Sequence, residues 1–546
     1  MLPHNNIALL SLLSLATALV MGCATAQPAA PPTPGGEETP IYGGILINHP
    51  GDADPPSFDL QKENVYNANR SVSPAYNNLI TLAPPELEKL VPDLAEKWEY
   101  SPDGKTLTFT LRKGVKFHNG NDFTSADVKF NLDRMRGVIT EGPGALVSPR
   151  KDLVGAIERI DTPDPHTAVV RLKYPQASLV PYLATVFTPM YNKEWIEAGH
   201  DPQKEVNGTG AFKFKEYIRG TSVELVKNDN YWNKGLPYLD GVKTYIIPDR
   251  STVLASLRTG QVMFMLLTQS QYETLQPQVE GGDLRGKLSL VKVPTDGGGA
   301  GNWLNTTKKP FDDLRVRQAL NLAVDRKEVA KIQGGPDAVV RGWMATGTFY
   351  ALPPEELAKL PGYGPDKAAE RAEARRLLAE AGFPNGLALK GITRNGQNFI
   401  DTAIVYTDQF KKVGITVEIQ LMDSSVFYER LDARDFDISL SGGGSGTGED
   451  PDSVFGQFHK CGSPRNYGAF CDPKVEDLFS RQSQAIDPKE RQKLSWELEK
   501  LVINLAPSLS SGYSTPAKWA VNTQVHGVLD RRESQCCRLD QAWLAK

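Results

Sequence analysis

The sequence predicts an α/β protein with more than one domain. The chain has 546 residues, which is too long for a single hydrophobic core. Between residues 365 and 440, helical and strand periodicities alternate, which is typical of an α/β lobe. Acidic and basic residues nearly balance, at a formal net charge of −4, so the composition gives no indication of nucleic-acid binding.

The stretch from residue 94 to residue 135 carries the clearest local pattern. Ser-Pro-Asp-Gly at 101–104 predicts a turn. Residues 106–111 alternate between threonine and large apolar side chains, which predicts a half-buried strand. Thr124 followed by Asp127 resembles a capping box, so we expect a helix to begin at Ser125. This stretch therefore predicts a strand, a loop and a capped helix.

The remaining elements follow from the same periodicities and from their flanking residues. Asp312 or Asp313 can cap a helix whose apolar residues share one face. Gly382 and Gly414 are expected to end the helices before them. The other predicted strands are 45–47, two within 157–172, 415–421 and 436–440; the other predicted helices are 179–190, 365–381, 402–413, 473–484 and 488–504.

The N-terminus has the pattern of a targeting segment. Residues 7–21 are apolar but too short to span a membrane comfortably. Val20-Met21-Gly22-Cys23 resembles a bacterial lipobox, although no Lys or Arg precedes Ile7. The resemblance implies a signal peptide at 1–22 and a lipid on the Cys23 thiol, and the Pro-rich segment 23–40 would be a tether. The alternative is that the protein is secreted without a lipid anchor and that Cys23 has no role in targeting.

Five short motifs, in a fixed order, resemble the signature of the solute-binding proteins of peptide and nickel ABC importers, family 5. The resemblance covers the chain from about Tyr42 to the C-terminus. It implies a two-lobed, periplasmic-binding-protein-like fold of class II, of the large type with an additional lobe, in which hinged mixed sheets are flanked by helices. The motifs are LAEKW at 94–98, LRKGVKF at 111–117, DV at 127–128, GTGAFKF at 208–214 and PFDDLRVRQA at 310–319.

The resemblance also implies how the lobes divide the chain. Lobe I would be discontinuous, built from residues 41–72, 206–295 and 515–546. The additional lobe would occupy 73–205, and lobe II would occupy 296–514. Ligand would lie between the lobes and favour the closed state through contacts to both.

The resemblance implies the substrate-binding component of an ABC importer, which captures a peptide or similar small solute and delivers it to permease subunits. Alternatives on the same fold are a binder of opines, oligosaccharides or a chelated metal, or a non-transport sensor or chaperone lipoprotein. No GxSxG, GxGxxG or HExxH motif occurs, so we expect no enzyme, no cofactor and no metal site. We expect an extracytoplasmic monomer, lipid-anchored or periplasmic.

Two glycine loops are the main candidates for the ligand site, because glycine lets backbone amides approach a ligand closely. The first loop, 296–301, precedes Asn302 and Trp303; Trp303 could stack on ligand or could be a core residue. The second runs from Ser441 to Asp452 and could form part of the site or could be a tight connection. The resemblance also favours Arg465 as a carboxylate partner and Tyr76 near the lobe junction. The candidate ligand-binding residues are Tyr76, Asn302, Trp303, Ser441, Gly442, Gly443, Thr447, Asp450 and Arg465.

One departure from the family pattern bears on the ligand. Peptide-binding members carry an Asp three positions before their Asp-Pro motif, where it pairs with the α-ammonium of the ligand. Here Thr447 takes that position before Asp450-Pro451. A neutral residue there suggests a ligand without a free amino terminus at that point, such as a sugar, an opine or a modified peptide.

The five cysteines separate into three groups. Cys23 is the predicted lipid site. Cys461 and Cys471 flank a short loop of an exported protein, which predicts a local disulfide. Cys536 and Cys537 are adjacent, and the sequence does not explain them.

Overall fold

A computed structural model describes residues 39–49, 54–63, 66–83, 89–293, 301–441, 450–510, 512–528 and 538–545. Contacts divide the chain into Met1–Thr39 and Pro40–Lys546, and the second unit holds the fold. The predicted signal peptide, Cys23, most of the tether and the Cys536-Cys537 pair lie outside the described residues. Among the described helices, none combines the length and the apolar character that crossing a membrane requires.

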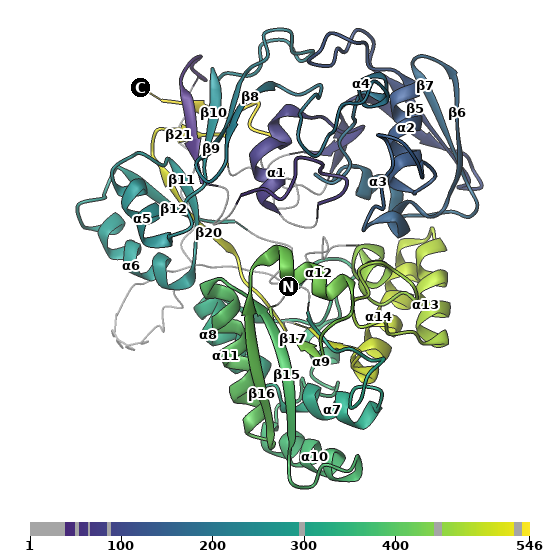
Figure 1. The fold of residues 1–546 in the computed structure, drawn as a ribbon, viewed down its shortest axis with the longest axis vertical. Helices are drawn as coiled ribbons and strands as arrows, with labels where there is room; N and C mark the ends of the chain where they lie inside the picture. The colour runs from purple at the N-terminus through teal and green to yellow at the C-terminus, as the bar shows by residue number, and fades with distance from the viewer. Residues whose placement is uncertain are drawn as a thin grey trace, which may run out of the picture. The chain divides into compact units, whose positions relative to one another are not determined.

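A seven-stranded mixed sheet draws its strands from distant parts of the chain (Figure 1). β1 lies between β10 and β11 and is parallel to both, and the other pairings are antiparallel. Helices α5 (Arg250–Arg258) and α6 (Gln269–Glu280) belong to the same region. In spatial order the strands are β12 (Leu288–Val293), β20 (Ala517–Asn522), β11 (Phe264–Leu267), β1 (Ile45–Asn48), β10 (Gly241–Tyr245), β9 (Ser222–Lys227) and β8 (Phe212–Ile218).

A four-stranded antiparallel sheet contains the best-predicted stretch of the sequence. Its strands, in order, are β4 (Ala95–Tyr100), β5 (Thr106–Leu111), β7 (Thr167–Leu172) and β6 (Ile157–Asp164). In β5 the apolar residues are buried and the threonines are half-buried, as the alternation predicts. Helix α2 (Ser125–Met135) packs on this sheet, and both hydrogen bonds of the predicted capping box between Thr124 and Asp127 form.

A three-stranded parallel sheet forms the third framework, in the order β16 (Ile415–Met422), β15 (Leu387–Arg394), β17 (Ile438–Ser439). Helix α11 contacts β15 and β16, and α12 contacts β15 (Figure 1). Asp313 caps α7, as predicted. The helices of this part are α7 (Leu314–Ala323), α8 (Arg326–Gly334), α9 (Pro354–Leu357), α10 (Lys367–Glu380), α11 (Gln397–Lys411), α12 (Ser424–Asp432), α13 (Pro473–Gln484) and α14 (Pro488–Leu505).

Short elements connect these three sheets and pair in small ladders. The short helices are α1 (Tyr66–Val72), η1 (Ser73–Ala75), η2 (Lys151–Val154), α3 (Leu179–Leu183), α4 (Lys193–Glu197), η3 (Gly335–Asp337) and the π-helix η4 (Asp452–Gly456). The short strands are β2 (Ile80–Leu82), β3 (Leu90–Pro92), β13 (Asn302–Trp303), β14 (Val339–Val340), β18 (Ser508–Leu509), β19 (Tyr513–Ser514), β21 (Val525–His526) and β22 (Trp543–Leu544).

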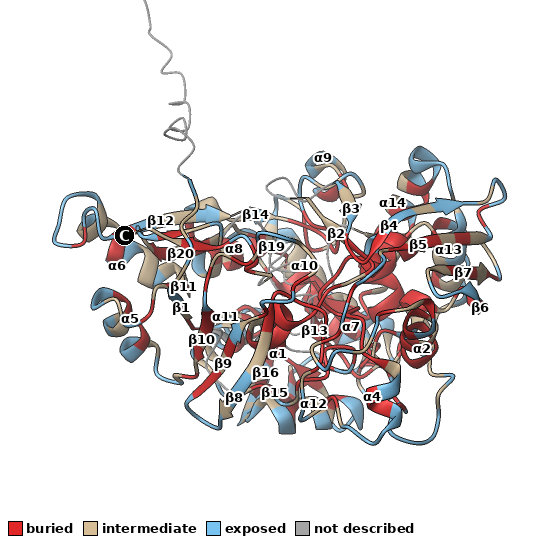
Figure 2. Cartoon of the chain, turned by 90° about the horizontal axis from the view of Figure 1, so that it is seen from above, coloured by how far each residue is buried: buried red, intermediate tan, exposed pale blue. Residues whose placement is uncertain are grey.

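Each sheet has its own buried apolar cluster, coloured red in Figure 2. The mixed and parallel sheets with flanking helices confirm the predicted α/β class. The helix expected at 179–190 ends at Leu183, so the predicted extent of this helix was wrong. The lobe boundaries proposed from the sequence stay predictions.

Candidate functional site

An aromatic cluster lies beside the parallel sheet. It is formed by Trp303, Phe427, Tyr428, Phe458 and Tyr467. The ring centroid of Trp303 is 5.2 Å from that of Phe458 and 5.7 Å from that of Tyr467. Trp303 is only 1% exposed, and its indole Nε1 makes no hydrogen bond to any described residue. The side chain is thus packed as a core residue, yet it retains a buried polar atom without a partner.

The carboxyl ends of β15 and β17 lie beside this cluster. Arg394 ends β15, and its guanidinium lies over the ring of Phe399 at 3.5 Å and near Tyr428 at 5.6 Å. Ser441 follows β17 and is buried. Neither Arg394 Nε nor Ser441 Oγ finds a hydrogen-bond partner in the described part of the chain. Ligands of open α/β sheets bind outside the carboxyl ends of parallel strands, where these atoms lie.

Strand β13 joins the predicted first loop to the same region. Asn302 and Trp303 pair with β18, and the Trp303 amide donates to Ser439 Oγ at 3.2 Å. Both side chains are buried. Glycines 297–299 before them lie outside the described residues, as do Gly442, Gly443 and Thr447 of the second loop.

Arg465 lies next to the cluster, with its guanidinium 4.7 Å from the ring of Phe458. The side chain is 1% exposed, and Nη1 donates to Gln457 Oε1 at 2.5 Å. Burial raises the pKa of the Tyr467 hydroxyl to about 12, and the nearby Arg465 cation opposes that rise. The loop that carries Arg465 is closed by a disulfide between Cys461 and Cys471.

Asp450 belongs to a charge network. Its carboxylate accepts two hydrogen bonds of 2.8 Å from Arg491, and Arg491 also lies 3.4 Å from Asp452. Burial works against the Arg491 cation, but the attraction of the two carboxylates dominates and raises its pKa. Asp450 therefore anchors the end of the predicted second loop to α14, and its carboxylate is already occupied.

Asp452 and its neighbours connect this region to the four-stranded sheet. Ser178, just before α3, donates to Asp452 Oδ2 at 2.5 Å. Lys460 forms an ion pair of 3.1 Å with Asp152 of η2. These contacts hold the segment after β17 against α3 and η2.

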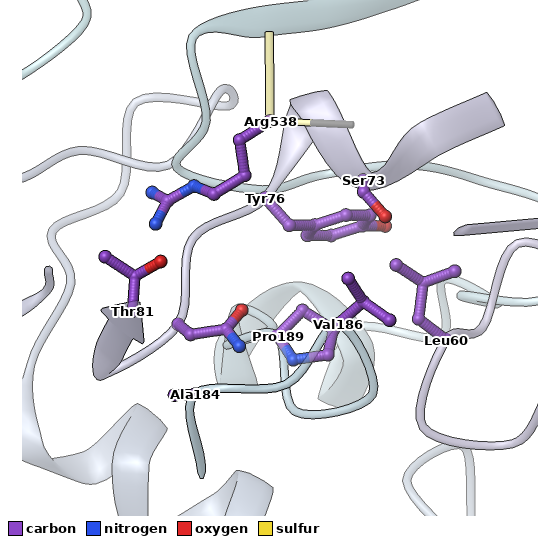
Figure 3. A pocket seen from close by; sticks show the side chains of 9 residues that line it. Leu60, Ser73, Tyr76, Thr81, Ala184, Val186, Pro189 and Arg538 are labelled. Carbon is purple, nitrogen blue, oxygen red and sulfur yellow. The ribbon is translucent and has the colours of Figure 1, made fainter. Parts of the chain in front are cut away.

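Tyr76 lies elsewhere, in a small pocket of about 20 Å³ between η1 and the segment 184–189 (Figure 3). Arg538 reaches into the same pocket and forms an ion pair of 2.8 Å with buried Asp93. The Tyr76 ring packs edge-on against Tyr191. This volume suits about one water molecule and cannot hold a peptide. Tyr76 is therefore not brought together with the other predicted residues.

The structure brings together Asn302, Trp303, Ser441 and Arg465 around the aromatic cluster, and it adds residues that the sequence did not suggest. Arg394 ends β15, a strand that was not predicted from the sequence, so it was missed. Ser178 and Asp152 likewise had no signal in the sequence. Within the described ranges, no group of three or more His, Cys, Asp or Glu residues is arranged to hold a metal ion.

Comparison with known proteins agrees with this geometry. Residues 89–465 match the family described as bacterial extracellular solute-binding proteins, family 5 middle. The chain is 28% identical to the glutathione-binding protein GsiB of Salmonella typhimurium over 457 residues, 81% of this chain and 85% of that protein. The GsiB of Escherichia coli K12 is 28% identical over 444 residues, 79% and 82% of the two chains.

Solved structures show the same fold. The periplasmic binding protein DppA of Helicobacter pylori, in complex with the peptide STSA, aligns with a TM-score of 0.79 at 26% identity, covering 93% of this chain and 99% of that one. The protein AgaA of A. tumefacien R10, in complex with agropinic acid, aligns with a TM-score of 0.77 at 25% identity, covering 92% and 99%. These alignments confirm the predicted two-lobed periplasmic-binding-protein fold, and the family match spans more than half of the chain. The chain therefore belongs to the bacterial extracellular solute-binding proteins of family 5, and it is the substrate-binding component of an ABC importer.

Proposed function

We propose that the protein captures a small acidic solute, peptide-like or opine-like, against the aromatic cluster at the carboxyl ends of β15 and β17. The observation that carries this proposal is a set of buried polar atoms without partners: Trp303 Nε1, Ser441 Oγ and Arg394 Nε. Trp303 Nε1 and Arg394 Nε can only donate hydrogen bonds. A buried donor without an acceptor costs about 1–3 kcal/mol, so a bound acceptor would recover that free energy.

A carboxylate suits these atoms best. Arg394 presents a planar guanidinium, the geometry that binds carboxylates with two parallel hydrogen bonds. The aromatic rings beside it offer apolar area to the rest of a small molecule. The relatives are named for glutathione, and the solved neighbours hold a peptide and agropinic acid, all of which are organic acids.

The test is a binding panel on protein that has been unfolded, dialysed and refolded to remove carried solute. Calorimetry would compare glutathione, the tetrapeptide Ser-Thr-Ser-Ala, agropinic acid and a neutral disaccharide. We expect at least one acidic solute to bind and to raise the melting temperature with concentration, and no solute to be turned over. Binding of the disaccharide alone would contradict the proposal.

A substitution pair tests the anchor. Arg394→Gln removes the charge but keeps a polar side chain. It should weaken binding of the acidic solute roughly 10- to 100-fold, which is the change in affinity expected when a hydrogen bond to a charged group is lost. Arg376→Gln is the matched control, because Arg376 is exposed and pairs with Glu373 on α10. If Arg394→Gln binds the acidic solute as tightly as Arg376→Gln does, Arg394 does not contact the ligand.

We further propose that Cys23 carries a lipid anchor, that the tether ends near residue 40, and that the protein works as a monomer with permease subunits. The lipobox-like sequence supports the anchor. Mass spectrometry of the protein from membranes should find a diacylglyceryl mass on Cys23, and Cys23→Ser should release the protein from the membrane. An unmodified, soluble wild-type protein would favour plain secretion.

A further inference from the structure

We infer that Lys292 and Lys518 form a charged clasp that keeps the end of helix α8 attached to the mixed sheet while the lobes open and close. The clasp consists of these two lysines, the Gly334 carbonyl oxygen and the Asp337 carboxylate. Lys518 Nζ donates to the Gly334 carbonyl oxygen at 3.3 Å, and Lys292 Nζ lies 2.7 Å from Asp337 Oδ2. The inference concerns the motion of the lobes, so it does not depend on which solute the protein binds.

The two lysines are neighbours on one face of the mixed sheet. They lie directly opposite each other on the antiparallel strands β12 and β20, where like charges destabilise a sheet. Lys518 is also only 4% exposed. Burial lowers the pKa of Lys518, the repulsion of Lys292 adds to that fall, and Glu273 on α6 offsets only part of it. The mixed-sheet region alone therefore does not compensate for this placement.

The compensating partners come from the region of the parallel sheet. Asp337 raises the pKa of Lys292 through their ion pair, and it also opposes the fall in the pKa of buried Lys518. Gly334 is the last residue of α8, and carbonyl groups at the C-terminus of a helix carry partial negative charge that favours a cation. The Thr515 hydroxyl donates to the same carbonyl oxygen at 3.1 Å. Both lysines are thus neutralised across the boundary between the two regions.

Close packing encloses the same helix end. Gly335 follows α8 with a φ of 75°, and a Cβ added there would lie 2.3 Å from Cδ of Gln269, at the start of α6. The end of α8 is therefore in contact with α6 as well as with the lysines of β12 and β20.

The clasp lies where the chain passes between the two regions. β12 ends at Val293, β20 begins at Ala517, and these residues are also opposite each other. The lysines are the next pair along the same strands. In the lobe division that the sequence predicts, the connections from β12 to β13 and from β19 to β20 join lobe I to lobe II. A rotation about these connections displaces the atoms beside them least, so the clasp can persist in the open and closed states.

The chemistry of lysine suits a contact that must survive a rotation. An ammonium group on a flexible four-carbon stem can follow a moving oxygen atom, whereas the planar fork of arginine holds a carboxylate in one orientation. The hydrogen bond between Ser178 and Asp452 differs, because it would have to break for the additional lobe and lobe II to separate. The clasp therefore restrains the lobes when no solute is bound.

Small-angle X-ray scattering of solute-free protein tests the inference without a ligand. The double variant Lys292→Met, Lys518→Met keeps the apolar stems but removes both cations, so the lobes should sample a wider range of orientations. We expect a larger radius of gyration than in the wild type. Lys243→Met is the matched control, because Lys243 lies on the same sheet and pairs with Glu224 of the neighbouring strand. An unchanged radius in the double variant, or an equal rise in the control, would overturn the inference.

A second set of variants changes the clasp from both sides. Lys292→Met should fold, because the side chain of Lys292 is 39% exposed, and Asp337→Asn removes the charge of its partner. Each variant should raise the radius of gyration. Their combination should raise it by less than the sum, because both substitutions break the same ion pair. Fully additive changes would show two separate local effects and contradict a shared clasp.

Calorimetry on the solutes that the wild type binds provides a further readout. The clasp variants should weaken every solute by a common factor, roughly two- to fivefold, because a smaller fraction of the protein has its lobes ready to close. Different factors for different solutes would place the lysines in the ligand site and overturn the inference. If no compound of the panel binds, the proposed function fails, and the scattering of the solute-free variants still decides the role of the clasp.

Discussion

The hydroxyl of Ser178 donates a 2.5 Å hydrogen bond to the carboxylate of Asp452 across 274 positions of sequence. Asp452 is 1% exposed, and the same carboxylate also accepts from Gln482 at 2.5 Å and Ser483 at 2.6 Å. Ser178 belongs to the region of the four-stranded sheet, whereas the other partners follow the parallel sheet. In the lobe division that the sequence predicts, this contact joins the additional lobe to lobe II, and it would have to break for those lobes to separate.

Ser178→Ala should weaken solute binding without changing which solutes bind. The variant removes one donor from a buried carboxylate, so we expect a loss of about 1 kcal/mol from the closed state, or roughly fivefold in affinity. Calorimetry on the acidic panel would measure it. Ser480→Ala, at an exposed position of α13, is the control. A change in solute preference would place Ser178 in the ligand site instead.

Arg491→Met should lower the free energy of unfolding by about 3–5 kcal/mol, because it leaves the buried Asp452 and the half-buried Asp450 without their cation. Chemical unfolding in urea would measure this loss. Arg376→Met breaks exposed pairs on α10 and should cost at most about 1 kcal/mol. Similar losses in the two variants would mean that the Asp450–Arg491 network contributes little.

Glu499 predicts a pH dependence of stability. Burial raises the pKa of its carboxyl to about 7, from a usual value of 4.5, although Oε1 accepts the amides of Trp343 and Met344. The folded protein holds this proton at pH values where the unfolded chain has lost it. The stabilisation that this group contributes is therefore fully present below about pH 4.5 and is lost as the pH rises through about 7. The total loss in the free energy of unfolding is up to about 3 kcal/mol.

Glu499→Gln should match the wild type near pH 5 and exceed its stability at pH 8. Glu497→Gln is the control, because Glu497 is exposed on the same helix. Urea unfolding at pH 5, 6, 7 and 8 would measure both variants. Equal pH profiles for wild type and Glu499→Gln would show that Glu499 is charged in the folded protein.

Reduction of the Cys461–Cys471 disulfide should destabilise the protein and weaken solute binding together. The bridge spans ten positions, and a loop of that size corresponds to about 2–3 kcal/mol. Because Arg465 lies within the loop, its guanidinium should lose its fixed position. Thermal unfolding and calorimetry of a Cys461→Ser, Cys471→Ser variant would test both effects. Weaker stability with unchanged affinity would separate Arg465 from ligand binding.

Local chemistry made most elements predictable. Helix α13 begins and ends where the sequence places it, because Asp472 caps it and proline occupies its first turn. The capping box at Thr124 defined the start of α2 in the same way. The start of α11 was missed by five residues, since Gly396 offers no capping side chain. An apolar run such as 179–190 does not reveal whether a buried segment is helical throughout.

The candidate site was only partly predictable. Glycine loops and the aromatic Trp303 indicated the segment before β13 and the segment after β17, but nothing near Ser178 in the sequence points to Asp452. Long-range pairings of this kind depend on how the sheets are assembled.

Strand β20 lies between β11 and β12 in the seven-stranded sheet, although it comes from residues 517–522. During synthesis, both neighbours are complete more than 200 residues before their shared partner exists. Until then their hydrogen-bonding edges are open to other chains. A fragment that stops before residue 517 would retain those edges permanently, which makes it a target for proteolysis or aggregation.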